Sequence, residues 1–154
     1  MASAPPSNTN FGNYRAHAAL KILLAELQHT SIDSDGRVTF TRLQQSFQRV
    51  WIQGYIVCRE GDDVVDIDDG SEVMSLDVGP LLQSQPHLNT VLQVGRYVSC
   101  ISLLEGHPEE GLLDLRIESV CELDAPADAL AEPYWWLEVA DAHRERLACA
   151  ERGN

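Results

Sequence analysis

Apolar residues follow a helical spacing near the start of the chain and a strand spacing after about residue 50. The early apolar positions lie at i, i+3, i+4 and i+7, the spacing of one helix face, and predict a docking helix over residues 14–29. These positions are Leu20, Leu23, Leu24 and Leu27. Residues 39–49 suit either a strand or a short helix, and the pattern leaves both open.

Five short strands are predicted where aromatic and β-branched residues alternate with polar ones. They span Val50–Cys58, Val64–Asp68, Glu72–Val78, Arg96–Leu104 and Leu113–Leu123. Gly54 predicts a bulge or bend in the first strand. Asp69-Gly70 predicts a tight hairpin, because glycine tolerates a positive φ. The expected inward residues of the last strand are Leu113, Leu115, Ile117, Cys121 and Leu123, with Ser119 as the one polar residue in that phase.

A closing helix is predicted over residues 133–150, after an acidic linker rich in Ala and Pro, because Pro133 suits the first helical position. One apolar stripe holds Trp136, Val139, Ala140, His143 and Leu147, and Trp135 and Ala142 extend a second. A helix that only covers its own barrel needs one stripe, so the second predicts contact with a partner. A helix buried deep in its own domain is the alternative. The predicted partner-binding residues are Tyr134, Trp135, Trp136, Leu137, Val139, Ala142, His143 and Arg146.

These elements predict one all-β domain with flanking helices over residues 14–150, built on a five-stranded OB-fold barrel at 50–123. Hairpins and helices at each end fit a small closed barrel better than a sandwich. Residues 1–13 are rich in Pro, Ser and Asn and are expected to be a flexible tail. The length of 154 residues fits a single domain.

Negative charge dominates the composition: 24 Asp and Glu oppose 11 Lys and Arg, giving a net charge of −13, and Lys21 is the only lysine. Nucleic-acid affinity depends mainly on Lys and Arg that neutralise phosphates, so direct binding to DNA or to an anionic membrane is expected to be weak or absent. The four cysteines show no C-x-x-C spacing and are expected to be reduced, intracellular thiols. We expect no signal segment and no membrane span.

No catalytic, cofactor-binding or metal site is predicted. The acidic residues at 62–77 resemble a calcium loop, but with Asp66 as the first ligand the glycine falls at the fifth position instead of the sixth. The histidines are scattered, and no G-x-S-x-G, H-E-x-x-H or phosphate-binding glycine loop accompanies them. The acidic cluster is therefore interpreted as a solvated face of the hairpin. The lack of a catalytic motif favours a protein that is not an enzyme.

A single-stranded DNA platform is the main alternative use of such a barrel. Its stacking residues would be Trp51, Tyr55 and Tyr97, and its phosphate contacts Arg49, Arg59, Arg96 and Arg116. No base lies between Arg59 and Arg96, whereas eight acids do. Packing of the aromatics in the barrel, with arginines at its rim, is therefore favoured over a DNA platform.

Five short segments, in this order and with these gaps, resemble the RecQ-mediated genome instability protein 2 family. They are Trp51-Ile52-Gln53-Gly54, Asp68-Asp69-Gly70, Gly95-Arg96-Tyr97-Val98, Glu122-Leu123 and Trp135-Trp136-Leu137-Glu138-Val139. The likeness runs from about residue 20 to residue 144, and the hairpin looks most like plant-type members.

The resemblance implies a nuclear, non-catalytic OB-fold subunit that pairs with the OB domain of RecQ-mediated genome instability protein 1. That pair would join topoisomerase III and a RecQ helicase of the Bloom type in a complex that dissolves double Holliday junctions. Carried over by position, Trp135, Leu137 and Val139 become interface candidates. Within the same fold, a protein like the replication protein A middle subunit or a telomere-capping protein that binds single-stranded DNA is the alternative.

Overall fold

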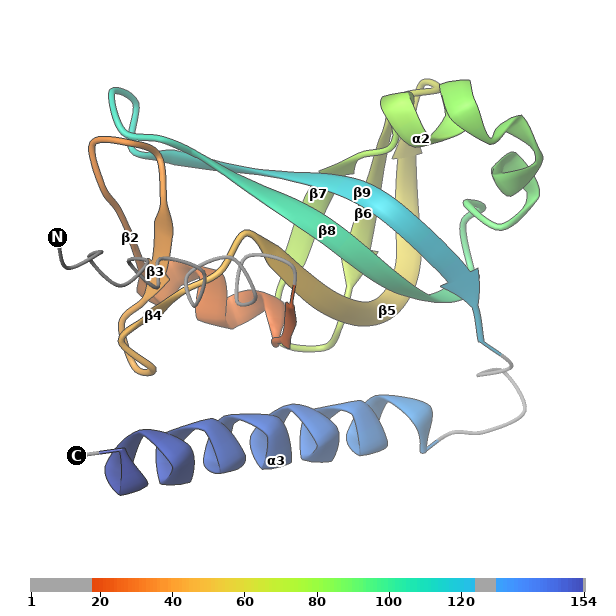
Figure 1. Ribbon diagram of the computed structural model, residues 1–154. Helices are drawn as coiled ribbons and strands as arrows, with labels where there is room; N and C mark the ends of the chain where they lie inside the picture. The colour runs from red at the N-terminus through yellow and green to blue at the C-terminus, as the bar shows by residue number, and fades with distance from the viewer. Residues whose placement is uncertain (1–17, 124–129, 154) are drawn as a thin grey trace, which may run out of the picture.

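The computed structural model describes residues 18–123 and 130–153, which form a β-barrel, a smaller sheet and a long C-terminal helix (Figure 1). The barrel strands are β5 (Arg49–Glu60), β6 (Val64–Asp68), β7 (Val73–Asp77), β8 (Tyr97–His107) and β9 (Leu112–Glu122). Their order is β5-β6-β7-β9-β8, and β8 pairs again with β5, so the sheet closes on itself. The five expected barrel strands are confirmed, with small shifts at their ends.

Gly54 lies where β5 passes from one neighbour to the next. Residues up to Tyr55 pair with β8, and residues from Tyr55 onward pair with β6. A Cβ atom on Gly54 would overlap the backbone oxygen of Asp68, so only glycine allows the two strands to approach this closely. The expected bend is therefore at Gly54, and the bulge follows between Ile56 and Cys58.

The α-helix expected at 14–29 is wrong over its described part. The structure has a strand, β1 (Ala19–Lys21), followed by a short 3₁₀ helix, η1 (Leu24–His29). β1 runs parallel to β5 and forms its backbone pairing with that strand, with Leu20 opposite Val50. Leu20, Ile22 and Leu24 are all fully buried. The alternation of these three buried residues fits a strand, just as the leucine spacing fits a helix. The pairing with β5, which is distant in the sequence, decides in favour of the strand.

A second sheet contains the segment whose structure the sequence left open. It consists of β2 (Thr30–Ile32), β3 (Val38–Phe40) and β4 (Gln45–Ser46), so residues 39–49 include strands and a turn instead of a helix. The Phe40 and Phe47 rings meet edge to face at 6.0 Å. In Figure 1 this sheet lies beside the far end of the long β8–β9 hairpin.

The inward phase expected for β9 holds only in its first half. Leu115 and Ile117 are buried as expected, but Cys121 is exposed, and Val120 packs against the core instead. Ile101 pairs with Ser119 and Ser102 with Ile117, so Glu118 is a bulged residue. One extra residue reverses the side-chain alternation that follows it. Ser119 is consequently exposed instead of inward-facing.

The connection between β7 and β8 contains two short helical segments, α2 (Gly79–Ser84) and η2 (Pro86–Thr90). The closing helix, α3 (Ala131–Arg152), begins two residues before Pro133 and lies along both sheets (Figure 1). The expected flexible tail at 1–13 and most of the expected linker lie outside the described residues. Among the helices that the structure describes, none is long and apolar enough to cross a bilayer.

Candidate partner interface on the C-terminal helix

One side of α3 packs on the chain's own barrel. Trp135 and Val139 are buried, with 1% and 3% of their surface exposed, and the Trp135 ring lies 6.0 Å from the Trp51 ring. Ala142, His143 and Arg146 continue this side and are half-buried. The expected grouping of the stripes is therefore corrected: Trp135 faces the barrel beside Val139, whereas Trp136 lies at the border of this side and is 41% exposed.

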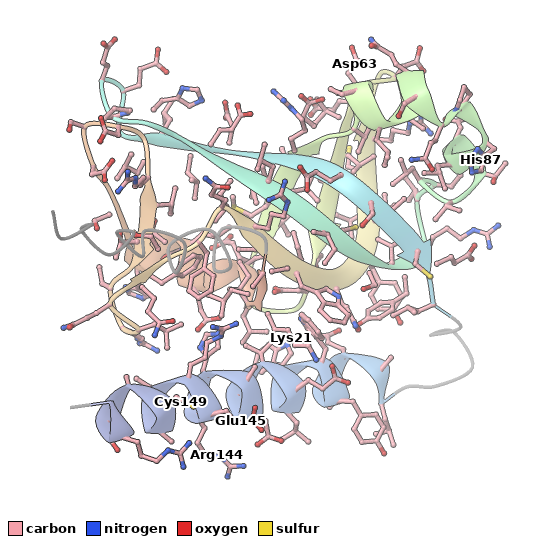
Figure 2. All side chains as sticks on the ribbon, in the orientation of Figure 1. Lys21, Asp63, His87, Arg144, Glu145 and Cys149 are labelled. Atoms are coloured by element: carbon pink, nitrogen blue, oxygen red, sulfur yellow. The ribbon has the colours of Figure 1, made fainter. Side chains whose placement is uncertain are left out.

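The only lysine of the chain lies at this contact. The Lys21 ammonium is 4.6 Å from the Trp51 ring centroid and 5.8 Å from that of Trp135, and it pairs with a Glu138 oxygen at 3.1 Å. A cation over aromatic faces is attracted by their negative quadrupole. Lys21 therefore links β1, β5 and α3 (Figure 2).

His143 links α3 to the N-terminal segment with both ring nitrogens. Its Nε2 lies 2.8 Å from the Lys21 carbonyl oxygen, which can only accept, so Nε2 donates. Its Nδ1 lies 3.1 Å from a Glu26 carboxylate oxygen, a contact that favours a proton on Nδ1 as well. The hydrogen bond with Glu26 raises the pKa of His143, and burial opposes this increase. The charged imidazolium is therefore the form that fits this site.

The β6–β7 turn joins three parts of the molecule through Asp69, which is fully buried. One carboxylate oxygen accepts the Leu24 N–H at 2.7 Å, and the other accepts the backbone and hydroxyl donors of Ser71 and the Glu72 N–H. The Asp69 carbonyl accepts the indole N–H of Trp136 at 2.9 Å. The sequence predicted this turn from Asp69-Gly70, but not the buried hydrogen bonds.

The opposite side of α3 carries large apolar residues that are exposed. Leu137 exposes 63% of its surface, Tyr134 52%, Leu147 46% and Trp136 41%. Trp136 occupies the border, since its indole N–H bonds to the turn while part of its ring faces solvent. A single-domain protein gains nothing by keeping these side chains in water. This exposed side is the candidate interface.

The predicted partner-binding residues thus divide between two sides of one helix. Tyr134, Trp136 and Leu137 lie on the exposed side. Trp135, Val139, Ala142, His143 and Arg146 face their own domain, where the Arg146 guanidinium lies 4.8 Å from the Phe47 ring centroid. A partner contact of this second group stays a prediction, and its visible role is to hold α3 in place.

The residues of a DNA platform are engaged within the chain. Tyr97 is buried against Tyr55, with ring centroids 4.8 Å apart, and burial raises its pKa to about 12. Trp51 lies under Lys21 and donates to the Ser99 hydroxyl at 2.6 Å.

The four arginines proposed for phosphate contacts have partners too. Arg49 pairs with Glu118 and Arg96 with Glu122, each at 2.6 Å, and Arg116 lies near Asp77 and Glu105. Arg59 donates to the Leu92 carbonyl and the Asn89 side chain. This arrangement favours protein contacts over phosphate contacts, and weak DNA binding stays a prediction.

One group of potential metal ligands occurs among the described residues. The ligand atoms of Cys58, Glu60 and Asp66 lie within 4.8 Å of one another across β5 and β6. The group is solvent-facing, and one Asp66 oxygen already accepts the Ser75 hydroxyl. Cys100 is the one buried cysteine, and burial raises the pKa of its thiol to about 12, which keeps the unreactive thiol form.

A family model described as RecQ-mediated genome instability protein 2 matches residues 18–143, from β1 to the inward-facing His143 of α3. The chain belongs to this family. The RecQ-mediated genome instability protein 2 family makes it an OB-fold genome-maintenance protein whose relatives partner with another OB-fold subunit. A search of curated proteins found no match.

Solved structures show the same OB fold at low sequence identity. A chain of the Stn1–Ten1 complex from S. pombe superposes with a TM-score of 0.68 at 15% identity, covering 89% of this chain and 99% of that one. A chain of a replication protein A heterotrimer bound to single-stranded DNA gives 0.60 at 10% identity, covering 84% and 98%. Yeast replication protein A bound to single-stranded DNA gives 0.55 at 16% identity, covering 88% and 92%. The expected OB fold is confirmed.

Proposed function

We propose that this chain is a non-catalytic scaffold subunit that pairs, through the exposed side of α3, with the OB domain of RecQ-mediated genome instability protein 1. The observation that carries the proposal is the apolar surface of Tyr134, Trp136, Leu137 and Leu147, which remains exposed after Trp135 and Val139 have fixed the helix to the barrel. Burying such side chains against a second protein removes apolar area from water. Aromatic residues are also enriched at the centres of interfaces.

The pair would support a complex of topoisomerase III and a RecQ helicase of the Bloom type, which dissolves double Holliday junctions in the nucleus. Family membership supports this role. A scaffold role agrees with a site made of exposed apolar side chains without a nucleophile–base pair among its described residues.

Single-stranded DNA binding, as in a replication protein A middle subunit or a telomere-capping protein, is the second candidate. The likeness of the fold to replication protein A favours it. The burial of Tyr97 and the pairing of Arg49 and Arg96 with carboxylates favour the scaffold instead.

The decisive experiment is co-purification of the full chain with the partner OB domain, comparing Leu137→Asp with Val94→Asp. Both substitutions introduce a carboxylate at an exposed apolar position, since Leu137 is 63% exposed and Val94 60%, but Val94 lies outside α3. Leu137→Asp should abolish or sharply weaken pairing, since buried interface anchors are worth about 2 kcal/mol or more. Val94→Asp should pair normally, and both variants should keep the native circular dichroism spectrum.

Normal pairing of Leu137→Asp would contradict the proposed interface. Trp135→Ala serves a separate purpose, because it should lower the melting temperature whether or not a partner is present. Titration with labelled single-stranded DNA distinguishes the second candidate: the scaffold role predicts dissociation constants of about 10⁻⁴ to 10⁻⁶ M or weaker at physiological salt. Submicromolar binding that is lost in Tyr55→Ala would favour the DNA-binding role.

A further inference from the structure

The barrel wall is closed between β7 and β9 by a single residue pair, Asp77 with Arg116. Before that pair, residues 73–76 of β7 and 112–115 of β9 form no pair with each other. β7 pairs on its other side with β6, and β9 pairs with β8. Among the described residues, each strand therefore presents an open edge to a gap in the wall.

A cavity of about 270 Å³ occupies this gap. Its apolar lining comes from Val64, Leu76, Leu113 and Leu115. Leu76 and Leu115 are buried in the core beneath the cavity, so its accessible apolar surface comes from Val64 and Leu113. An open strand edge beside an apolar floor is the arrangement to which an extended peptide adds as a further strand.

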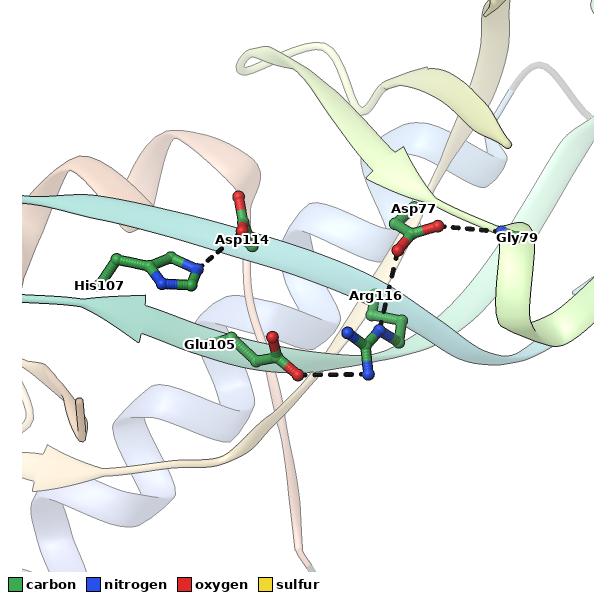
Figure 3. A network of polar contacts seen from close by, with 6 residues as sticks. All are labelled: Asp77, Gly79, Glu105, His107, Asp114 and Arg116. Atoms are coloured by element: carbon green, nitrogen blue, oxygen red, sulfur yellow. Dashed lines mark hydrogen bonds and ion pairs between the residues drawn. The ribbon is translucent and has the colours of Figure 1, made fainter. Parts of the chain in front are cut away.

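The rim of the cavity is negatively charged. It carries Asp77, Glu105 and Asp114 around a single arginine, Arg116 (Figure 3). The Arg116 Nη1 lies 3.3 Å from Glu105 and its Nε 3.8 Å from Asp77, so one guanidinium is shared by two carboxylates. The Arg116 Nε is buried and has no hydrogen-bond partner among the residues that the structure describes, and Asp114 contacts His107 at 2.7 Å. Negative charge is therefore in excess at the rim.

We propose that this gap binds an extended, basic segment of a protein partner, which adds as a strand along the open edge of β7. Alternate side chains of a strand point to opposite faces. Apolar residues of the segment would contact the partly exposed Val64 and Leu113, while Lys or Arg residues between them would meet Asp77, Glu105 and Asp114. Acidic side chains also oppose pairing of this open edge with other copies of the same acidic chain. A basic segment is attracted to the same side chains and can pair with the edge.

The surface differs from the proposed interface on α3 and does not depend on it. A nucleic acid is disfavoured here, because its phosphates would approach the three carboxylates. The rim charges remain accessible, with 37% of the Glu105 side chain and 69% of the Asp114 side chain exposed.

The test uses the full chain and a fluorescein-labelled heptapeptide of alternating Arg and Val, RVRVRVR. A peptide of the same composition in which the Arg and Val residues are grouped instead of alternating, RRRRVVV, controls for charge alone. The rim variant Glu105→Gln with Asp114→Asn should bind RVRVRVR about fourfold more weakly, since each exposed ion pair is worth roughly a factor of two. The matched control Glu145→Gln with Asp141→Asn removes two exposed carboxylates from α3 and should bind normally.

Hydrogen exchange locates the peptide on the fold. Binding at the gap should slow exchange of those amides of residues 73–76 that point to the open edge and are not bonded to β6. The proposal is overturned if RVRVRVR does not bind, if RRRRVVV binds equally well, or if the control variant weakens binding as much as the rim variant. Protection of these amides by a single-stranded oligonucleotide instead of the peptide would also overturn it.

Discussion

Trp136 donates its indole N–H to the backbone carbonyl of Asp69 over 2.9 Å, and this bond fastens the C-terminal helix to the β6–β7 turn. The same Asp69 holds the first residue of η1 through its carboxylate. Segments from the beginning, middle and end of the chain therefore meet at one buried residue. The helix that offers the candidate interface depends on this junction for its position.

Asp69→Ala should destabilise the domain by about 3 kcal/mol, because it leaves the buried Leu24 N–H without its charged acceptor. Chemical denaturation measures the change in the free energy of unfolding. Asp62→Ala is the matched control, since Asp62 is an exposed acid in the neighbouring turn, and it should unfold like the unaltered chain. Equal stability of the two variants would show that the Asp69 hydrogen bonds contribute little.

Lys21→Met should loosen α3, because it removes the cation from Trp51 and Trp135 together with the ion pair to Glu138. The expected loss is about 1 kcal/mol at this partly exposed site. Tryptophan fluorescence during urea denaturation reports it directly. Lys21→Arg keeps a cation over the rings and should recover most of the stability. An unchanged midpoint for Lys21→Met would contradict this role.

The barrel strands and the hairpin could be predicted from the sequence because their signals are local. Alternation of apolar and polar side chains fixed the strands, and the glycine of Asp69-Gly70 fixed the turn. The segment at 18–29 could not be predicted in this way. Its leucine spacing suits a helix, and only the parallel pairing of Leu20 with Val50, residues distant in the sequence, makes it a strand.

The candidate site could be predicted as a helix with two apolar stripes, but not as an oriented surface. The stripe that faces the barrel is chosen by Trp51 and Lys21, which receive Trp135 and lie far from it along the chain. The exposure of Cys121 follows from the bulge at Glu118, a feature of strand pairing that alternation alone does not reveal.

The His143 contact predicts a pH dependence of stability. The pKa of His143 is raised in the folded state, so its stabilising contribution is fully present below its unfolded pKa of about 6.5. The contribution disappears as the pH rises through the higher folded pKa. The stability difference between the unaltered chain and His143→Gln should therefore be larger at about pH 5.5 than at about pH 8.5.

Thermal melts at the two pH values measure this difference, and an NMR titration of the imidazole gives the pKa. Glu26→Gln should lower the pKa of His143, because the carboxylate is the main cause of its increase. His87→Gln changes an exposed histidine of η2, away from α3, and it should leave the profile unchanged. A pH-independent difference for His143→Gln would contradict the charged contact.

Gly70→Ala should be more damaging than Gly95→Ala, although both glycines have a positive φ, of 85° and 90°. At Gly95 no atom of the described residues lies within 4 Å of the added methyl group, so the cost is that of the backbone conformation, about 1 kcal/mol. At Gly70 the methyl would overlap the carboxylate end of Glu132 and lie 3.5 Å from the Trp136 ring, so the Glu132 side chain at the start of α3 has to move. Denaturation should therefore give a larger loss for Gly70→Ala, and the double variant with Glu132→Ala should recover part of it. Equal losses at both glycines would show that Glu132 swings away freely and that the turn does not constrain the helix.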